Sequence, residues 1–196
     1  KLQEISVGIN PHSHEWSMLR QHLEKHKLDF EGKTRDAYLM CGDYSNYDKR
    51  LPYCLIELAL KIMNNWYGDD SYGNAVRESI FIATFNAFHL CGKSLYRCSM
   101  GNPSGCIITA QINSLVNSLI ARVVFGTMGR QQNPPVTMSS FTKYVVYKSY
   151  GDDNICSVSA CAPWFNMRTF AAVCATFGIT YTTASKGDID QDYITW

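Results

Sequence analysis

The chain has 196 residues, which favours one domain with a sizeable core. Hydrophobic residues make up 46% and charged residues 18%, a composition that excludes an intrinsically disordered protein. The formal net charge is +1, so binding to an anionic polymer would have to depend on local patches. No apolar run reaches membrane-spanning length, and the first ten residues do not form a signal peptide.

The first half of the chain predicts three helices and a strand. An amphipathic helix is expected over residues 12–27, with Trp16, Leu19 and Leu23 on one side. An apolar strand follows from residue 35 and turns polar at Gly42. Pro52 is suited to start the next helix, which ends at Gly68. We expect this helix to bury the stripe Leu55, Leu58, Ala59, Ile62 and Trp66. Residues 74–90 predict a further helix.

The second half alternates strands and helices. A strand from residue 93 leads into a glycine-rich loop, and a long apolar helix is expected over 106–126. Residues 143–150 and 155–160 predict a β-hairpin with its turn at 151–154. A helix over 164–178, closed by Gly178, precedes an alternating strand at 179–185. The order predicts the α+β class, with helices packed on an antiparallel sheet.

Cysteine and histidine give no strong metal signal. The eight cysteines contain no close Cys-x-x-Cys pair and most lie in apolar runs, which favours reduced core cysteines. The histidines at 12, 14, 22 and 26 lack a supporting cysteine or carboxylate pattern, so zinc is the weaker interpretation.

Two aspartates mark the end of the first predicted strand. Asp43 closes the strand, and Asp48 follows five residues later. For Asp48 alone, capping the next helix is a reasonable alternative to a functional role. Capping does not explain the second carboxylate at Asp43.

A second polar group follows the glycine-rich loop. Gly101 and Gly105 flank Ser104, and Thr109, Asn113 and Asn117 then recur every fourth residue of an apolar helix. Polar groups on such a face need partners, or they reduce stability. Asn117 is as readily explained by a bridge to a neighbouring strand as by function. A ligand is the more attractive partner for Thr109 and Asn113.

The third group is Asp152 and Asp153 at the predicted hairpin turn. One aspartate suits a turn, but two adjacent carboxylates repel each other and require a positive partner. With Asp43 at another strand end, three carboxylates could lie together. A pair of Mg²⁺ ions would relieve this repulsion, since hard divalent cations prefer carboxylate and phosphate oxygens.

These groups, in this order, resemble the palm region of RNA-dependent RNA polymerases from picorna-like positive-strand RNA viruses. "DYSNYD" resembles motif A, "SGCIITAQIN" motif B, "YGDD" motif C and "ASKGD" the motif D region with its lysine. "VGINP" also resembles the segment that enters the palm in that group. The resemblance covers nearly the whole chain.

The resemblance implies catalytic roles for four residues. Asp43 and Asp152 would bridge two Mg²⁺ ions, with Mn²⁺ able to substitute, and Asp153 would be a weaker or outer ligand. The ions would activate the primer 3′-hydroxyl and neutralise the triphosphate. Lys186 would act as general acid toward the pyrophosphate that leaves.

The resemblance also implies five substrate-binding residues. Asp48 and Asn113 would hydrogen-bond the incoming ribose and recognise its 2′-hydroxyl. Ser104 and Thr109 would help to position that sugar. Gly105 would let the loop move between open and closed forms of the site.

The implied partners are the RNA template and primer, nucleoside triphosphates, and the fingers and thumb of the same polyprotein-derived polymerase. Residues 1–196 would form a single palm domain, with finger-derived portions near 1–35 and 65–100. The thumb and the basic part of the fingers are expected outside these residues. The implied location is the host cytoplasm, at viral replication complexes.

Two other functions are considered. A reverse transcriptase also carries a Tyr-x-Asp-Asp motif, but such enzymes exclude ribonucleotides with a bulky motif A side chain. The corresponding residue here is Asp48, which is small and polar, so a reverse transcriptase is disfavoured. The second alternative is a non-catalytic fragment that binds RNA or other parts of a polymerase.

Overall fold

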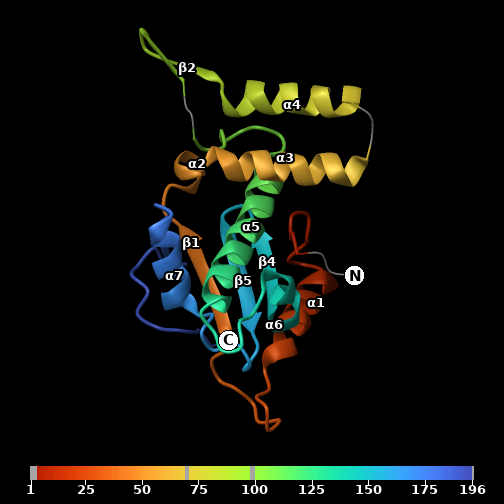
Figure 1. Ribbon diagram of the computed structural model, residues 1–196, viewed down its shortest axis with the longest axis vertical. Coiled ribbons are helices and arrows are strands. Elements are labelled where there is room, and N and C mark those ends of the chain that lie inside the picture. Colours follow the sequence, from red (N-terminus) through yellow and green to blue (C-terminus); the bar gives the residue numbers. More distant parts are fainter. Residues whose placement is uncertain (1–3, 69–70, 98–99, 196) are drawn as a thin grey trace.

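A four-stranded antiparallel sheet forms the centre of the protein (Figure 1). The structure, a computed structural model, describes residues 4–68, 71–97 and 100–195. The strand order is β4 (Val145–Tyr150), β5 (Asp153–Val158), β1 (Leu39–Tyr44) and β6 (Tyr181–Thr183). Every neighbouring pair is antiparallel. The predicted α+β class is therefore confirmed.

The two faces of the sheet have different coverings. Helices α5 (Thr109–Gly129) and α7 (Met167–Thr176) share the main hydrophobic core with Met40, Tyr147 and Cys156. On the opposite face, helix α1 (His14–Leu23) contributes Leu19 and Leu23 to a smaller cluster with Leu39 and Val146. Alternation along the strands produces this division, because successive side chains point to opposite faces. Asp43 and Asp153 follow the alternation onto the α1 side of the sheet, beyond that cluster.

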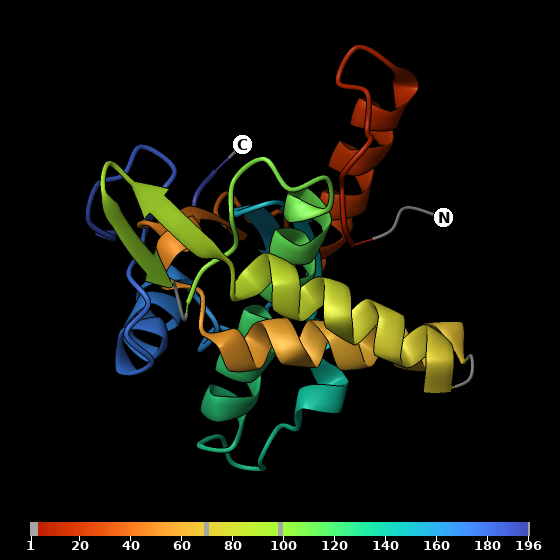
Figure 2. The ribbon, with the colours of Figure 1, turned by 90° about the horizontal axis from the view of Figure 1, so that it is seen from above.

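A second layer lies over one end of α5 (Figures 1 and 2). It contains α2 (Tyr47–Arg50), α3 (Tyr53–Tyr67), α4 (Ser71–Phe85) and the hairpin β2 (Phe88–Cys91)–β3 (Ser94–Arg97). The predicted helix over 74–90 is wrong at its C-terminal end, because α4 stops at Phe85 and residues 88–91 pair with 94–97. The two-residue turn at Gly92 and Lys93 allows this pairing, which helical periodicity does not reveal.

The buried face of α3 also differs from the expected one. Ile56 and Ala59 are buried, whereas Leu58, Ile62 and Trp66 of the predicted stripe are exposed, Trp66 by 86%. This helix is apolar around much of its circumference, so its period does not determine which side packs. The packing of α3 against α5 and α4 selects the Ile56 side.

Several element boundaries shift from the predicted ones. The short elements η1 (Glu24–His26), η2 (Met138–Ser140) and α6 (Phe141–Tyr144) were not expected as separate units. Strand β4 begins at Val145 rather than 143, and β5 begins at Asp153, which leaves a turn of two residues. Among the described cysteines, which form no disulfide, Cys156 and Cys174 are buried but Cys54, Cys91 and Cys161 are exposed. The prediction that most are core residues was therefore wrong.

The part of the chain that the structure describes includes no helix with both the length and the apolar character needed to cross a bilayer.

Candidate active site

Asn117 of helix α5 fixes the turn between β4 and β5 by hydrogen bonds from the interior of the protein. Asn117 is fully buried, and its Nδ2 donates to the carbonyl oxygens of Gly151, Asp152 and Asp153 at 3.0–3.2 Å. Its Oδ1 accepts from the hydroxyls of Tyr44 at 3.0 Å and Tyr147 at 2.6 Å. The bridging interpretation of Asn117 is thus confirmed, and its bridge supports the Asp152–Asp153 turn itself.

Two further polar side chains hold the same turn. Ser114, one helical turn before Asn117, accepts from the backbone N–H of Gly151 at 2.8 Å. Asn154 donates its amide to the carbonyl of Gly42 at 3.2 Å and accepts from the Tyr181 hydroxyl at 2.8 Å. Because all of these partners are buried, the turn has a fixed position relative to β1 and α5.

Asp43 lies beside this turn and faces a lysine. Its Oδ1 accepts from the backbone N–H of Tyr44 at 2.8 Å, and its Oδ2 lies 3.7 Å from the Nζ of Lys186. Lys186 has a positive φ of 63° in the turn after β6, and its side chain is 80% exposed. The pairing of β6 with β1 brings Lys186 close to the carboxylates. In sequence, Lys186 is 143 residues from Asp43 and 33 residues from Asp153.

The carboxylates affect one another. Partial desolvation raises the pKa of Asp153, the charges of Asp152 and Asp43 raise it further, and Lys186 opposes them. The charges of the other two aspartates therefore act on Asp153. Among the described residues, however, no three aspartate, glutamate, histidine or cysteine side chains are arranged so that they could hold a metal ion together.

A cavity of about 590 Å³ lies in front of the turn and brings together six of the nine predicted site residues. They are Asp48, Ser104, Thr109, Asn113, Asp152 and Asp153. Asp43 and Lys186 lie beside Asp153, outside this cavity. Asp48 is an exposed residue within α2, and α3 begins after Pro52 without a side-chain cap, so the capping alternative for Asp48 is wrong.

The loop that precedes α5 forms one wall of the cavity. Thr109, the first residue of α5, donates its hydroxyl to the carbonyl of Pro103 at 2.9 Å. Gly105 has a φ of 93°, and nothing lies within 4 Å of where its Cβ would be. Ser104 lines the cavity, whereas Gly105 does not. Gly105 therefore supplies an unusual backbone conformation in an open part of the loop.

Comparisons with known proteins establish the family of the chain. Residues 1–193 match the family described as viral RNA-dependent RNA polymerase. The chain belongs to this family. The predicted resemblance to polymerases of picorna-like viruses is therefore confirmed.

Two relatives and one solved structure show the extent of the similarity. The replicase polyprotein of acute bee paralysis virus (strain Rothamsted) is 31% identical over 190 residues, which cover 94% of this chain and 10% of that polyprotein. The RNA1 polyprotein of cowpea mosaic virus (strain SB) is 30% identical over 178 residues, or 90% of this chain and 9% of the polyprotein. A Sicinivirus 3Dpol RNA-dependent RNA polymerase has a TM-score of 0.70 at 18% identity, over 98% of this chain and 36% of that one.

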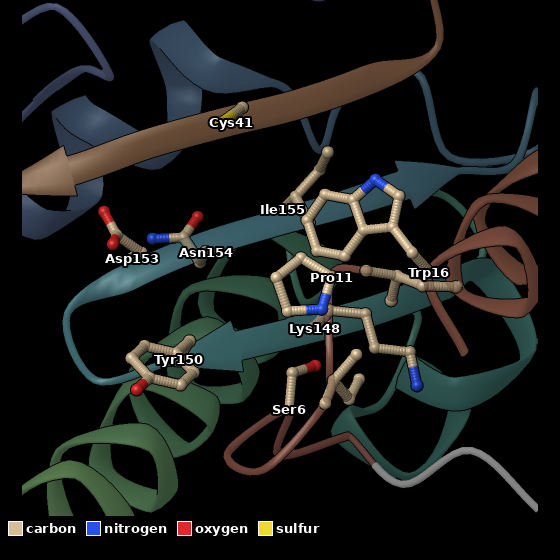
Figure 3. A pocket seen from close by; sticks show the side chains of 11 residues that line it. Ser6, Pro11, Trp16, Cys41, Lys148, Tyr150, Asp153, Asn154 and Ile155 are labelled. Carbon is tan, nitrogen blue, oxygen red and sulfur yellow. The ribbon is translucent and has the colours of Figure 1, made fainter. Parts of the chain in front are cut away.

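The chain thus spans about a tenth of these polyproteins and about a third of the solved polymerase. A second cavity, of about 520 Å³, lies on the α1 side of the sheet (Figure 3). Figure 3 shows Asp153 at one end of it and Trp16 of α1 at the other. Helix α1 therefore leaves the Asp153 end of the sheet uncovered.

Sequence reasoning missed three supporting residues of the candidate site, namely Ser114, Asn154 and Asn102. The sequence did offer a signal for Ser114, which is a polar residue between Asn113 and Asn117 on an apolar helix, and the structure buries it completely. Asn154 was assigned to the turn, but it is the second residue of β5 and is buried against β1 and β6. Asn102, in the loop before α5, donates to Asn113, a contact that no spacing rule predicts.

Proposed function

We propose that this chain is the catalytic palm of an RNA-dependent RNA polymerase that adds nucleotides from nucleoside triphosphates to an RNA 3′-hydroxyl, directed by an RNA template, during viral genome replication. One observation carries the proposal. The 590 Å³ cavity combines the Asp152–Asp153 turn, where phosphoryl chemistry needs negative ligands, with Asp48 and Asn113, which can recognise a sugar. Family membership provides the reaction class for this combination.

The carboxylate chemistry suits two Mg²⁺ ions, for which Mn²⁺ could substitute, but the described side chains form no ready three-ligand site, so the aspartates would have to rearrange to hold them. Hard cations prefer carboxylate oxygens, and the pKa of Asp153 is raised first by desolvation and then by the negative charges of Asp152 and Asp43. Asp43 and Asp152 would hold the ions, with Asp153 as an outer ligand. When bound, they would lower the pKa of the 3′-hydroxyl and neutralise charge on the phosphates. The Nζ of Lys186 lies 3.7 Å from Oδ2 of Asp43, so the lysine side chain would have to move away before an ion could bind that oxygen.

The remaining cavity residues act on the sugar. Asp48 and Asn113 hydrogen-bond the ribose and recognise its 2′-hydroxyl, since the Asp48 carboxylate has no partner among the described residues. Ser104 lines the same wall, and Thr109 fixes the loop through Pro103. The open, positive-φ position of Gly105 permits the loop to close on a nucleotide.

Lys186 donates a proton to the departing pyrophosphate. Its side chain is largely exposed yet reaches Asp43, so it can face a triphosphate bound at the same carboxylates. An ammonium in that position can transfer a proton as the P–O bond breaks.

The polymerase would act with an RNA template and primer and with a fingers and a thumb region of the same polyprotein product, in the host cytoplasm at viral replication complexes. Parts of the fingers would be residues near 1–35 and 65–100. The second range contains α4 and the β2–β3 hairpin, which lie farthest from the sheet in Figure 1. Asp48, small and polar at the sugar, favours ribonucleotides and disfavours a reverse transcriptase.

The test is template-directed primer extension by the polymerase polypeptide that carries residues 1–196, with Mg²⁺ and all four ribonucleotides. Asp152→Asn should abolish extension and leave the fold intact, because it removes a carboxylate charge but keeps the shape of the side chain. Circular dichroism and the unfolding midpoint provide the folding control. Extension by the Asn variant at near the wild-type rate would contradict the carboxylate assignment. A wild-type protein that binds RNA but never extends it would favour the non-catalytic alternative.

A further inference from the structure

Asn102 connects the two sides of the proposed sugar site. Its backbone N–H donates to the carbonyl of Asp48 at 2.8 Å, and its side-chain Nδ2 donates to Oδ1 of Asn113 at 2.7 Å. Gly101 brings the chain close enough for this contact, because a Cβ at Gly101 would lie 2.2 Å from the Asp48 carbonyl oxygen. One residue therefore fixes the loop to α2 and contacts the recognising side chain on α5.

The contact determines which atom Asn113 presents. Asn102 Nδ2 also donates to the carbonyl of Thr109 at 3.3 Å, and a carbonyl can only accept. The nitrogen of Asn102, and not its oxygen, must therefore face α5, so Asn113 must turn its own oxygen toward Asn102. The Nδ2 of Asn113 is then left without a partner among the described residues, at the wall of the 590 Å³ cavity. It is a donor ready for an acceptor on the ligand.

Asn102 is poorly explained as a purely stabilising residue. It is 1% exposed, and its Oδ1 has no hydrogen-bond partner among the described residues. A buried acceptor without a partner reduces stability, and an apolar side chain of similar size would avoid that cost. The amide is therefore expected to provide something other than stability, and the side chain that it contacts at the wall of the cavity is Asn113.

We propose that Asn102 is a positioning residue for sugar selection: it orients the Asn113 amide so that Nδ2 donates to the ribose 2′-hydroxyl oxygen. The inference rests on the proposed polymerase function. The 2′-hydroxyl is the group that distinguishes a ribonucleotide from a deoxyribonucleotide. A donor fixed toward it can form a hydrogen bond only with the ribonucleotide and therefore favours its use.

The experiment uses the polymerase polypeptide that carries residues 1–196 and compares kcat/KM for a matched ribonucleotide and deoxyribonucleotide. Asn102→Leu should lower the ribo-to-deoxyribo ratio by about fivefold, the effect of one neutral hydrogen bond, almost entirely through the ribonucleotide. Its unfolding midpoint should change little, because removal of the buried acceptor without a partner offsets in part the loss of the bonds that Nδ2 donates to Asn113 and Thr109. Asn65→Leu, on the exposed side of α3, is the matched control and should leave both values unchanged.

A second variant and a direct readout keep the test informative if Asn102→Leu does not fold. Asn102→Asp keeps the shape, but its ionised carboxylate can only accept, so Asn113 would turn over and the ratio should fall as well. In the 196-residue chain, the NMR resonances of the Asn113 side-chain amide should shift in both variants. An unchanged ratio in a folded variant overturns the inference. Equal losses for both sugars, with a lower unfolding midpoint, would reduce Asn102 to a structural residue. A wild-type polypeptide that extends no primer overturns the proposed function instead, and this inference with it.

Discussion

The Nδ2 of Asn117 lies 3.0 Å from the carbonyl oxygen of Asp152, although the two residues are 35 positions apart. Through this contact a completely buried amide on α5 determines where the turn with the Asp152 and Asp153 carboxylates lies. The position of the acidic turn therefore depends on the interior of the protein. This relationship makes Asn117 as important for the site as the residues that line it.

Replacement of Asn117 by Leu, which has a similar volume, should lower the free energy of unfolding by about 3 kcal/mol. The reason is that the carbonyls of the turn and the hydroxyls of Tyr44 and Tyr147 lose their common partner. Nucleotide addition should decrease at least tenfold in the protein that remains folded. Urea unfolding and single-nucleotide incorporation measure the two effects. Tyr147→Phe, which removes one of these bonds, should cost about 1 kcal/mol, and an equally mild Leu variant would contradict the proposed support.

Asn113→Ala should weaken the preference for ribonucleotides over deoxyribonucleotides, mainly through poorer use of the ribonucleotide. A site that hydrogen-bonds a hydroxyl discriminates against the analogue without it, because its own polar groups are then unpaired. Single-nucleotide incorporation with matched substrates measures the ratio. The Ala variant should also leave Asn102 Nδ2 without its side-chain acceptor. An unchanged ratio would remove Asn113 from the sugar site.

Lys186→Leu should slow the chemical step at saturating nucleotide by at least about tenfold, with little change in apparent nucleotide affinity. An exposed ion pair with Asp43 alone would be worth only about 1 kcal/mol or less. Lys186→Arg should rescue the rate only in part, since guanidinium keeps the charge but is a much weaker acid. Rapid-quench incorporation across pH separates these cases. A Leu variant with the wild-type rate would leave Lys186 as a surface residue of its turn.

The buried ring of His26 should make stability depend on pH. Burial lowers the pKa of His26 to about 4, and the charges of Lys25 and Arg35 act in the same direction. The unfolded chain takes up the proton near pH 6.5 but the folded protein only near pH 4, so stability is complete above pH 6.5 and is lost as pH falls toward 4. The loss is about 1–2 kcal/mol after solvent screening is allowed for.

This pH effect is measured as the difference between wild type and His26→Leu in urea unfolding at several pH values, which cancels the contribution of other groups. His14→Leu, at an exposed position of α1, is the matched control. The His26 variant should lose less stability than the wild type between pH 6.5 and pH 4. Parallel curves for the two proteins would contradict the assignment.

Some parts of the fold and site follow from local sequence because local chemistry decides them. The hairpin around Asp152 is predicted by two runs of β-forming residues and a turn, and Gly68 and Gly178 end their helices in the left-handed conformation, at φ 59° and 75°. Asp43 at a strand end and Asn113 on an apolar helix are conspicuous because a polar group there needs a partner. These residues were therefore accessible from the sequence.

Other parts depended on which surfaces meet. The apolar circumference of α3 offers more than one stripe, and only its neighbours choose Ile56 over Trp66. Residues 88–91 continue a helical pattern, yet they form a strand because they pair with residues 94–97. Lys186 reaches Asp43 only because β6 pairs with β1, and Asn102 meets Asn113 only because the loop crosses Asp48.

The sequence by itself thus determined the chemistry of this protein: which carboxylates, amides and lysine are present, in which order, and on which kinds of element. The tertiary structure decided how they are oriented, since the direction of the Asn113 amide and the position of the Asp152 turn are set by Asn102 and Asn117. The physical reason is that residue type and local period are encoded within a few positions. Hydrogen-bond partners of buried amides, in contrast, are chosen by contacts between distant segments.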